Sequence, residues 1–146
     1  MIYKTGNLLE ADEQIIVHQV NCQGVMGAGL AKAIRNKWPR VYDEYRRVCM
    51  KFQPEELLGK VLPVTVGDKI ILNVFGQLNY GKGLQTSYKT LEIALRKIEC
   101  KYEFQKVAFP LNMGCGLAGG DWHTVSSMID KIFGSNAVVY ILDKKV

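Results

Sequence analysis

Two patterns of apolar residues alternate along the chain. Short apolar runs rich in β-branched residues predict strands at residues 2–5, 15–20, 61–66, 70–75, 107–111 and 137–142. Between them, apolar residues that recur every three or four positions predict amphipathic helices at residues 30–38, 41–52, 88–98 and 122–133. Gly67-Asp68 predicts a hairpin between two of the strands. The pattern therefore predicts an α/β fold, a three-layer α/β/α sandwich with a mixed central sheet.

Local signals mark the ends of three predicted helices. Pro39 cannot continue the helix over residues 30–38, so that helix ends before it. Ser87 and Asp121 stand directly before two later helices, where a short polar side chain caps the first backbone N–H groups. The chain has 146 residues, enough for one sizeable core, so we expect residues 1–146 to form a single domain.

Glycines gather at two points, each after a predicted strand and before a predicted helix. The first loop holds Gly24, Gly27 and Gly29, and the second covers residues 114–120. Glycine lets backbone N–H groups approach a ligand, and the start of a helix attracts phosphate. The first spacing, G-x-x-G-x-G, matches neither the dinucleotide pattern G-x-G-x-x-G nor the Walker pattern.

Both glycine loops follow strands, so they can lie at the same edge of the sheet and hold one ligand between them. Two opposed loops of this kind suit a diphosphate better than a single phosphate. The alternative, that the glycines only form tight strand-to-helix turns, stays open.

The net charge of +5 adds little to this picture, because the basic residues are scattered along the sequence. The densest groups are Arg46-Arg47 and Lys144-Lys145. A solvated basic surface explains them, and attraction of anionic ligands, nucleic acid included, is the alternative. No aromatic-rich motif indicates a dedicated nucleic-acid module. No apolar run reaches the roughly 18 residues of a membrane helix and no signal peptide is evident, so we expect no membrane partner.

The four cysteines form no C-x-x-C pair, which argues against a zinc site or a disulfide scaffold and favours a reduced, cytoplasmic location. Cys22 and Cys115 lie in the glycine loops, but neither has a clear histidine base, so we expect packing roles for them. His18 and His123 lack an acidic cluster that would complete a metal site. We expect no metal and no cofactor.

A family resemblance rests on several segments taken in order. They are Gly6-Asn7-Leu8, His18-Gln19-Val20-Asn21, Met26-Gly27-Ala28-Gly29-Leu30-Ala31, Gly114-Cys115-Gly116-Leu117 and Trp122. With these segments the chain resembles a macrodomain over nearly its whole length. The Met-Gly-Ala-Gly-Leu-Ala form is most similar to the branch with terminal ADP-ribose protein glycohydrolase, the DNA ADP-ribosyl glycohydrolase antitoxins and the yeast-type ADP-ribose 1''-phosphate phosphatases.

The resemblance implies a cleft that binds ADP-ribose. It implies that Asn7 and Leu8 meet the adenine, that Leu142 and Asp143 border the adenine and its ribose, and that Asn21 reaches the distal ribose. The two phosphate loops implied are Gly27, Ala28, Gly29 and Leu30, and Gly114, Cys115, Gly116, Leu117 and Ala118. Tyr80 is a candidate to cover the distal ribose, and Gln77 to orient the ribose or a water.

The resemblance also shows where catalytic residues are expected. In the glycohydrolase branch a lysine follows the strand that matches residues 70–75, and an aspartate lies in the second glycine loop. Here Lys82 stands several residues beyond the strand, and Ala118 takes the aspartate position, with Asp121 three residues later. A water held by Asn21, the bound phosphates or Asp121 would then attack the distal ribose. Helix capping is the alternative role for Asp121.

The function implied is hydrolysis of ADP-ribosyl linkages on protein or nucleic acid, or of ADP-ribose 1''-phosphate. A non-catalytic module that binds ADP-ribose is the first alternative. A basic nucleic-acid-binding domain is a second alternative, and it would show steep salt dependence without a preference for ADP-ribose.

Overall fold

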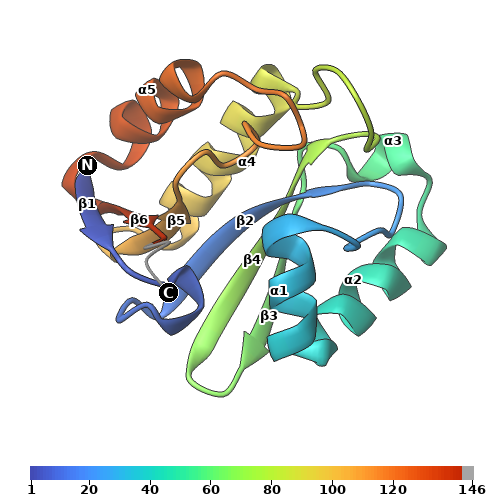
Figure 1. Cartoon of the computed structure of the whole chain (residues 1–146), viewed down its shortest axis with the longest axis horizontal. Helices are drawn as coiled ribbons and strands as arrows, with labels where there is room; N and C mark the ends of the chain where they lie inside the picture. The colour runs from blue at the N-terminus through green and yellow to red at the C-terminus, as the bar shows by residue number, and fades with distance from the viewer. Residues whose placement is uncertain (143–146) are drawn as a thin grey trace.

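The computed structural model describes residues 1–142. Its strands are β1 (Ile2–Thr5), β2 (Ile15–Asn21), β3 (Val61–Val66), β4 (Lys69–Gln77), β5 (Val107–Pro110) and β6 (Ala137–Ile141). Its helices are α1 (Gly29–Lys37), α2 (Pro39–Lys51), α3 (Pro54–Leu57), α4 (Tyr88–Lys101) and α5 (Trp122–Phe133), with short 3₁₀ turns η1 (Leu8–Glu10) and η2 (Gly134–Asn136). The strands and the four long helices predicted from the sequence are all present (Figure 1).

The six strands form one mixed sheet in the order β1-β6-β5-β2-β4-β3. All neighbours run parallel except β3, which pairs antiparallel with β4 through the predicted hairpin. Gly67 in its turn has a φ of 60°, a conformation that glycine adopts without strain. Because β2, β4 and β5 are parallel, the loops after them leave the sheet at one edge.

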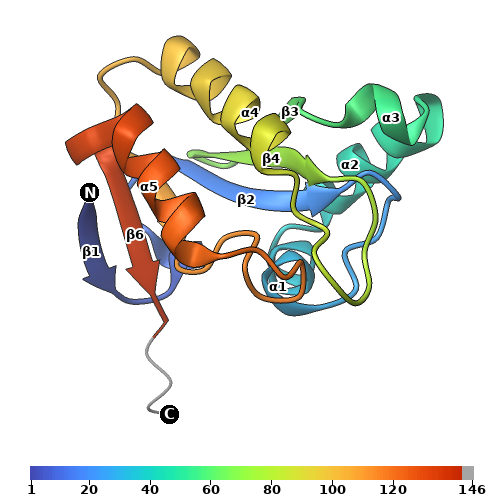
Figure 2. The same cartoon turned by 90° about the horizontal axis from the view of Figure 1, so that it is seen from above.

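Helices cover both faces of the sheet, as the pattern predicted. Alternate side chains of β2 point to opposite faces, so Ile16 packs with α1 and α2 while Ile15 and Val17 pack with α4 and α5. Figure 2 shows α4 and α1 on opposite sides of β2. The result is the expected three-layer sandwich with an apolar core on each side of the sheet.

Three local details differ from, or sharpen, the sequence expectations. The short helix α3 and the turn η1 carry too few apolar residues to form a helical pattern, so the sequence did not predict them. Ser87 occupies the cap position of α4, yet its side chain makes no capping hydrogen bond, and its backbone N–H donates to the Gly76 carbonyl at 2.7 Å. Asp121 caps α5 as predicted. None of the helices between residues 1 and 142 is long and apolar enough to cross a membrane.

Candidate functional site

A cavity of about 630 Å³ lies at the sheet edge where β2, β4 and β5 end. Its walls come from the carboxyl end of β2 with the first glycine loop, from the loop between β4 and α4, and from the second glycine loop after β5. The lining residues are His18, Gln19, Val20, Asn21, Val25, Gly27, Ala28, Gly29, Leu30, Ala31, Gln77, Tyr80, Gly81, Lys82, Pro110, Leu111, Asn112, Met113, Gly114, Gly116, Leu117 and Ala118. The two glycine loops therefore share one cavity, as their order along the chain predicted.

Most residues assigned to the site from the sequence line this cavity. They are Asn21, Gly27, Ala28, Gly29, Leu30, Gln77, Tyr80, Gly114, Gly116, Leu117 and Ala118. Asn7, Leu8, Cys115, Asp121 and Leu142 are not among its lining residues, and Asp143 lies outside the described residues. A contact of these residues with a ligand stays a prediction.

The helix that follows the first loop opens on the cavity. Helix α1 has nine residues, and no side chain caps its N-terminus, where Ala28 holds the cap position. Gly29, Leu30 and Ala31, whose backbone N–H groups precede the first helical hydrogen bond, all line the cavity. The exposed donors and the helix dipole make this end of the cavity favourable for an anion.

The first glycine loop is held from behind by Asn21 and the buried Tyr45. The Asn21 Oδ1 atom accepts from the backbone N–H of Gln23 at 2.9 Å and from the Tyr45 hydroxyl at 2.8 Å. Its Nδ2 atom donates to the Val25 carbonyl at 2.8 Å, and the Tyr45 oxygen accepts from the Gly24 N–H at 3.1 Å. Asn21 thus lines the cavity and also fixes the path of the loop.

A chain of side-chain hydrogen bonds ties the other two walls to β2. The Gln19 amide nitrogen donates to the Gln77 Oε1 atom and to the Thr86 hydroxyl, each at 2.9 Å. The Thr86 hydroxyl donates to the Gly114 carbonyl at 2.6 Å. The backbone N–H of Gln85 donates to the Ala118 carbonyl at 2.7 Å. These bonds fix the second glycine loop against the loop between β4 and α4.

Asn7 and Asp121, which were predicted to belong to the site, each cap a local helix or turn. The Asn7 side chain accepts from the Leu9 N–H at 3.0 Å and caps η1. The Asp121 carboxylate accepts from the backbone N–H and the hydroxyl of Thr124, at 3.0 and 2.9 Å. These bonds hold the pKa of Asp121 below its usual value, and they match the capping role rather than the acid–base role.

The cysteines have the properties expected of packing residues. Burial raises the pKa of the Cys22 thiol to about 12 and that of Cys115 to about 11. Each donates to a backbone carbonyl, Cys22 to that of Gln77 and Cys115 to that of Met113. Both are protonated near neutral pH and therefore poor nucleophiles. Residues 1–142 contain no cluster of three His, Cys, Asp or Glu side chains able to hold a metal ion.

Sequence reasoning missed four polar residues of the cavity wall, His18, Gln19, Lys82 and Asn112. His18 and Gln19 are the polar positions in an otherwise apolar strand, which was the available signal. Lys82 lies in a loop that no periodic pattern defines, but Gly81 and Gly83 on either side, with φ values of 115° and 88°, signal a sharp turn there. Lys82 is the one Lys or Arg among the lining residues, and no Asp or Glu is among them.

His18 is a buried, hydrogen-bonded histidine, as its place in a strand predicted. It is 1% exposed, and its Nε2 atom lies 2.6 Å from the Asn73 Oδ1 atom. The Asn73 amide nitrogen donates to the Leu62 carbonyl, so the Asn73 oxygen is the acceptor and His18 Nε2 carries the proton. Burial lowers the pKa of His18 from 6.5 to about 4, so the ring is neutral at physiological pH.

The buried ring makes stability depend on pH. The unfolded chain takes up a proton at His18 before the folded protein does, so the folded state loses stability as the pH falls from about 6.5 toward 4. Between pH 8 and pH 5 this group should remove about 2 kcal/mol from the free energy of unfolding. Urea unfolding at the two pH values would measure the loss. It should shrink in His18→Gln, which keeps a donor for Asn73 but does not titrate, and an equal loss in that variant contradicts the assignment.

Comparisons with known proteins identify the family to which this fold belongs. The Macro domain family model matches residues 17–129. A DNA ADP-ribosyl glycohydrolase of Mycobacterium tuberculosis is 29% identical over 147 residues, covering 94% of this chain and 41% of that protein. An ADP-ribose 1''-phosphate phosphatase of Candida glabrata is 31% identical over 90 residues, covering 56% of this chain and 50% of that protein.

A solved structure supports the same assignment. The macrodomain of Mycobacterium tuberculosis DarG superposes with a TM-score of 0.80 at 29% identity, over 95% of each chain. The chain spans about two fifths of the length of the mycobacterial glycohydrolase. Since the family model covers well over half of the residues and both glycine loops lie within or beside one cavity, this chain belongs to the Macro domain family.

Proposed function

We propose that the cavity binds ADP-ribose and that the protein hydrolyses the bond between the distal ribose and a carrier group. The observation that carries this proposal is the uncapped N-terminus of α1, which opens on the same cavity as the second glycine loop. Backbone N–H groups at both loops suit the two phosphates of a diphosphate. The names of the two relatives support an ADP-ribose ligand and a hydrolytic reaction.

The order of the cavity walls suggests where the distal ribose and the adenine of the ligand lie. The distal ribose lies between Asn21, Gln77 and the exposed ring of Tyr80. The adenine lies toward η1 and the end of β6, where Asn7, Leu8, Leu142 and Asp143 are the proposed contacts, and Cys115 belongs to the second phosphate loop. We take residues 1–142 with the remaining C-terminal residues as one functional domain. Its free cysteines fit a cytoplasmic location.

The chemistry proposed is attack of water on the anomeric carbon of the distal ribose. The bond to the carrier breaks as the new C–O bond forms, and the carrier leaves with the electron pair and a proton. No carboxylate lines the cavity in the part of the chain that the structure describes, so the rate rests on positioning and on electrostatics. Asn21 positions the loop and faces the ribose, and Lys82 supplies positive charge.

Substitution of Lys82 tests whether its positive charge contributes to the binding of ADP-ribose. Lys82→Gln removes the cation but keeps a polar side chain, and we expect the Kd for ADP-ribose to rise about tenfold, the effect of one charge-assisted contact. Isothermal titration calorimetry would measure it. Lys89→Gln, which removes an exposed lysine of α4 outside the cavity, is the matched control. Asp121→Asn should leave both affinity and turnover unchanged, and equal Kd values for all variants contradict the role of Lys82.

One experiment separates the proposed enzyme from the alternatives. The protein is offered ADP-ribosylated DNA, ADP-ribosylated protein and ADP-ribose 1''-phosphate, and free ADP-ribose and phosphate are measured beside the affinity for ADP-ribose. Release of ADP-ribose supports the glycohydrolase, and release of phosphate supports the phosphatase that the Candida glabrata relative suggests. Binding without turnover leaves a binding module, and absence of binding ends the proposal.

A further inference from the structure

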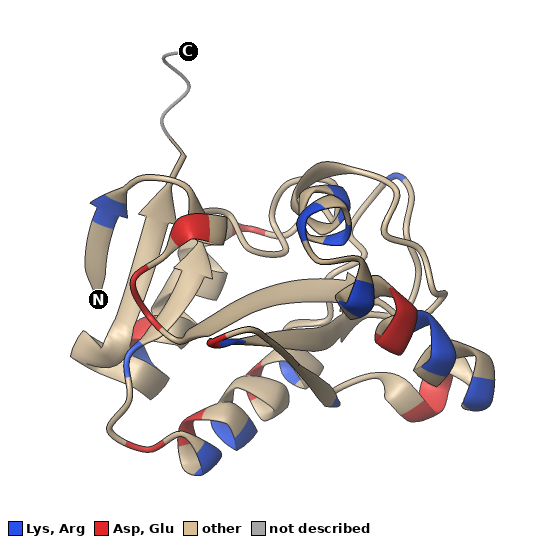
Figure 3. Ribbon diagram, turned by 90° about the horizontal axis from the view of Figure 1, so that it is seen from below, with Lys and Arg blue, Asp and Glu red and all other residues tan. Residues whose placement is uncertain are grey.

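The positive charge of this protein is concentrated in one pair of helices. Residues 29–51, which form α1 and α2, hold seven of the 19 Lys and Arg residues but only two of the 14 Asp and Glu residues. The other basic and acidic residues are equal in number, so the whole net charge of +5 resides in this segment. Seven basic residues therefore lie close together on α1 and α2, where Figure 3 shows Lys and Arg at several positions, and the other twelve are balanced by acidic residues along the rest of the chain.

Three of these basic side chains extend along α1 and onto α2. Lys32 follows Ala31 in the first turn of α1, the end of the helix that opens on the cavity, without lining the cavity itself, and Arg35 lies one helical turn further along α1. Arg46 of α2 shares a surface hollow of about 490 Å³ with Arg35. All three are exposed, and none makes an ion pair among residues 1–142. We call Lys32, Arg35 and Arg46 the phosphate track.

Other basic residues of the two helices are already engaged. Lys37 donates to the Leu9 carbonyl at 3.1 Å, Arg40 donates to the Thr65 carbonyl, and Arg47 pairs with Glu44 at 2.7 Å. Asp43 is the one acidic residue in the hollow that Arg35 and Arg46 share. Lys51, the seventh basic residue, has its Nζ atom 5.6 Å from the centre of the Phe52 ring at the end of α2. Among the described residues, the phosphate track and Lys51 are therefore the basic side chains of the two helices that make neither an ion pair nor a hydrogen bond.

The surface chemistry of this track fits a nucleic acid better than a protein. Between positions 29 and 51 the described chain has a single exposed large apolar residue, Met50, next to the end of α2 and outside the hollow that Arg35 and Arg46 share. Protein interfaces need an apolar or aromatic centre, whereas interfaces with nucleic acid are more polar and strongly positive. The Arg35 guanidinium lies 3.7 Å from the centre of the Tyr42 ring, which holds it as a flat cationic surface of the kind on which bases stack.

We propose that the phosphate track binds the backbone of a nucleic-acid strand whose ADP-ribosyl group enters the cavity. This inference rests on the proposed function, because it assumes that ADP-ribose occupies the cavity. Attachment of the strand at the distal ribose would bring its neighbouring phosphates to the mouth of the cavity, next to Lys32. Arg35 and Arg46 would then bind phosphates further along the strand.

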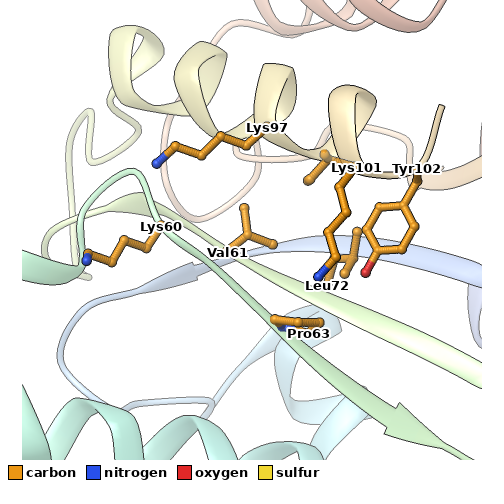
Figure 4. A pocket seen from close by; sticks show the side chains of 8 residues that line it. Lys60, Val61, Pro63, Leu72, Lys97, Lys101 and Tyr102 are labelled. Atoms are coloured by element: carbon orange, nitrogen blue, oxygen red, sulfur yellow. The ribbon is translucent and has the colours of Figure 1, made fainter.

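A second group of three lysines provides a rival surface and a matched control. Lys60, Lys97 and Lys101 line a pocket of about 290 Å³ between α4 and β3, together with Val61, Pro63 and Leu72 (Figure 4). α4 packs on the opposite face of the sheet from α1 and α2, so a strand that enters the cavity along the phosphate track does not reach this pocket. Reversal of these lysines changes the net charge as much as reversal of the track.

The test compares two triple variants of the full chain. One is Lys32→Glu/Arg35→Glu/Arg46→Glu, and the other is Lys60→Glu/Lys97→Glu/Lys101→Glu. Their affinities for a single-stranded 12-nucleotide DNA that carries one ADP-ribosyl group, for the unmodified DNA and for free ADP-ribose are measured between 50 and 200 mM NaCl. Circular dichroism and melting curves establish that both variants are folded.

For the unaltered protein, three phosphate contacts at a slope of about 0.7 each predict an approximately twentyfold loss of affinity for the modified DNA across this salt range. The track variant should lose most of this salt dependence and keep its affinity for free ADP-ribose. The α4–β3 variant should bind the modified DNA within about twofold of the unaltered protein, because helix α4 lies on the opposite face of the sheet from the track.

Each other outcome overturns a different statement. If free ADP-ribose does not bind the unaltered protein, the proposed function fails. If it binds but the two variants weaken DNA binding equally, only net charge matters and the track does not exist. If the α4–β3 variant alone is affected, the strand docks there. If the track variant binds the modified DNA as tightly as the unaltered protein does, the track does not bind a nucleic acid.

Discussion

Gly119→Ala should separate two walls of the cavity, with a loss of ADP-ribose affinity of at least about 100-fold and a loss of stability near 3 kcal/mol. A Cβ atom at Gly119 would lie 2.5 Å from the Gly83 carbonyl oxygen and 3.3 Å from the Leu84 Cα atom. These are backbone atoms of the neighbouring loop, which cannot rotate away as a side chain can. The Gly119 N–H also donates to the Gly116 carbonyl at 3.1 Å, so the clash is transmitted to the phosphate loop.

Gly83→Ala is the control that isolates this clash. Gly83 has a φ of 88° against 75° for Gly119, so both substitutions force an alanine into the left-handed region at a cost of about 1 kcal/mol. A Cβ atom at Gly83, however, meets nothing within 4 Å. Urea unfolding and calorimetry with ADP-ribose would compare the variants. Equal stability and equal affinity in both would show that the contact between the two loops does not shape the cavity.

The fold could be predicted from the sequence because the apolar residues follow two distinct patterns, continuous β-branched runs in the strands and a spacing of three or four positions in the helices. The alternation of Ile15, Ile16 and Val17 between the two cores is what a strand buried on both faces requires, and the structure has it. The shared position of the two glycine loops could also be predicted, because the loops that follow parallel strands all leave the sheet at the same edge. Both predictions depend on local chemistry and on the geometry of parallel strands.

The remainder of the site depends on the path of a loop, which apolar periodicity does not encode. The chain between Gln77 and Tyr88 runs back over the cavity because Gln19, Gln77 and Thr86 bond to one another and to the second glycine loop. That path brings Lys82 to the cavity wall, although it stands too far from β4 to match the lysine of the glycohydrolase branch. Asp121 was a catalytic candidate with helix capping as the alternative, and the structure shows its side chain as the cap of α5.

Asn21 was predicted as a catalytic residue, and its hydrogen bonds lead to a sharper expectation. The residue is 7% exposed, and its side chain bonds to Gln23, Val25 and Tyr45. Asn21→Ala removes three hydrogen bonds, one of them to the buried Tyr45 hydroxyl, so we expect a loss of about 3 kcal/mol in the free energy of unfolding at about 1 kcal/mol for each bond. The loosened loop should also raise the Kd for ADP-ribose by at least about tenfold, because the α1 N–H groups lose their fixed orientation.

Tyr45→Phe tests whether the loss arises through the loop. It removes only the hydroxyl, which bonds to Gly24 and to Asn21, and keeps the ring stacked 5.9 Å from Phe75. If Asn21 and Tyr45 act as one support, the double variant should lose less than the sum of the single losses, with a coupling of about 1 kcal/mol or more. Tyr42→Phe, on the same helix, is the control for removal of a hydroxyl. If Asn21→Ala lowered turnover while stability and affinity stayed at their original values, Asn21 would act in the chemical step and the loop-support role would be wrong.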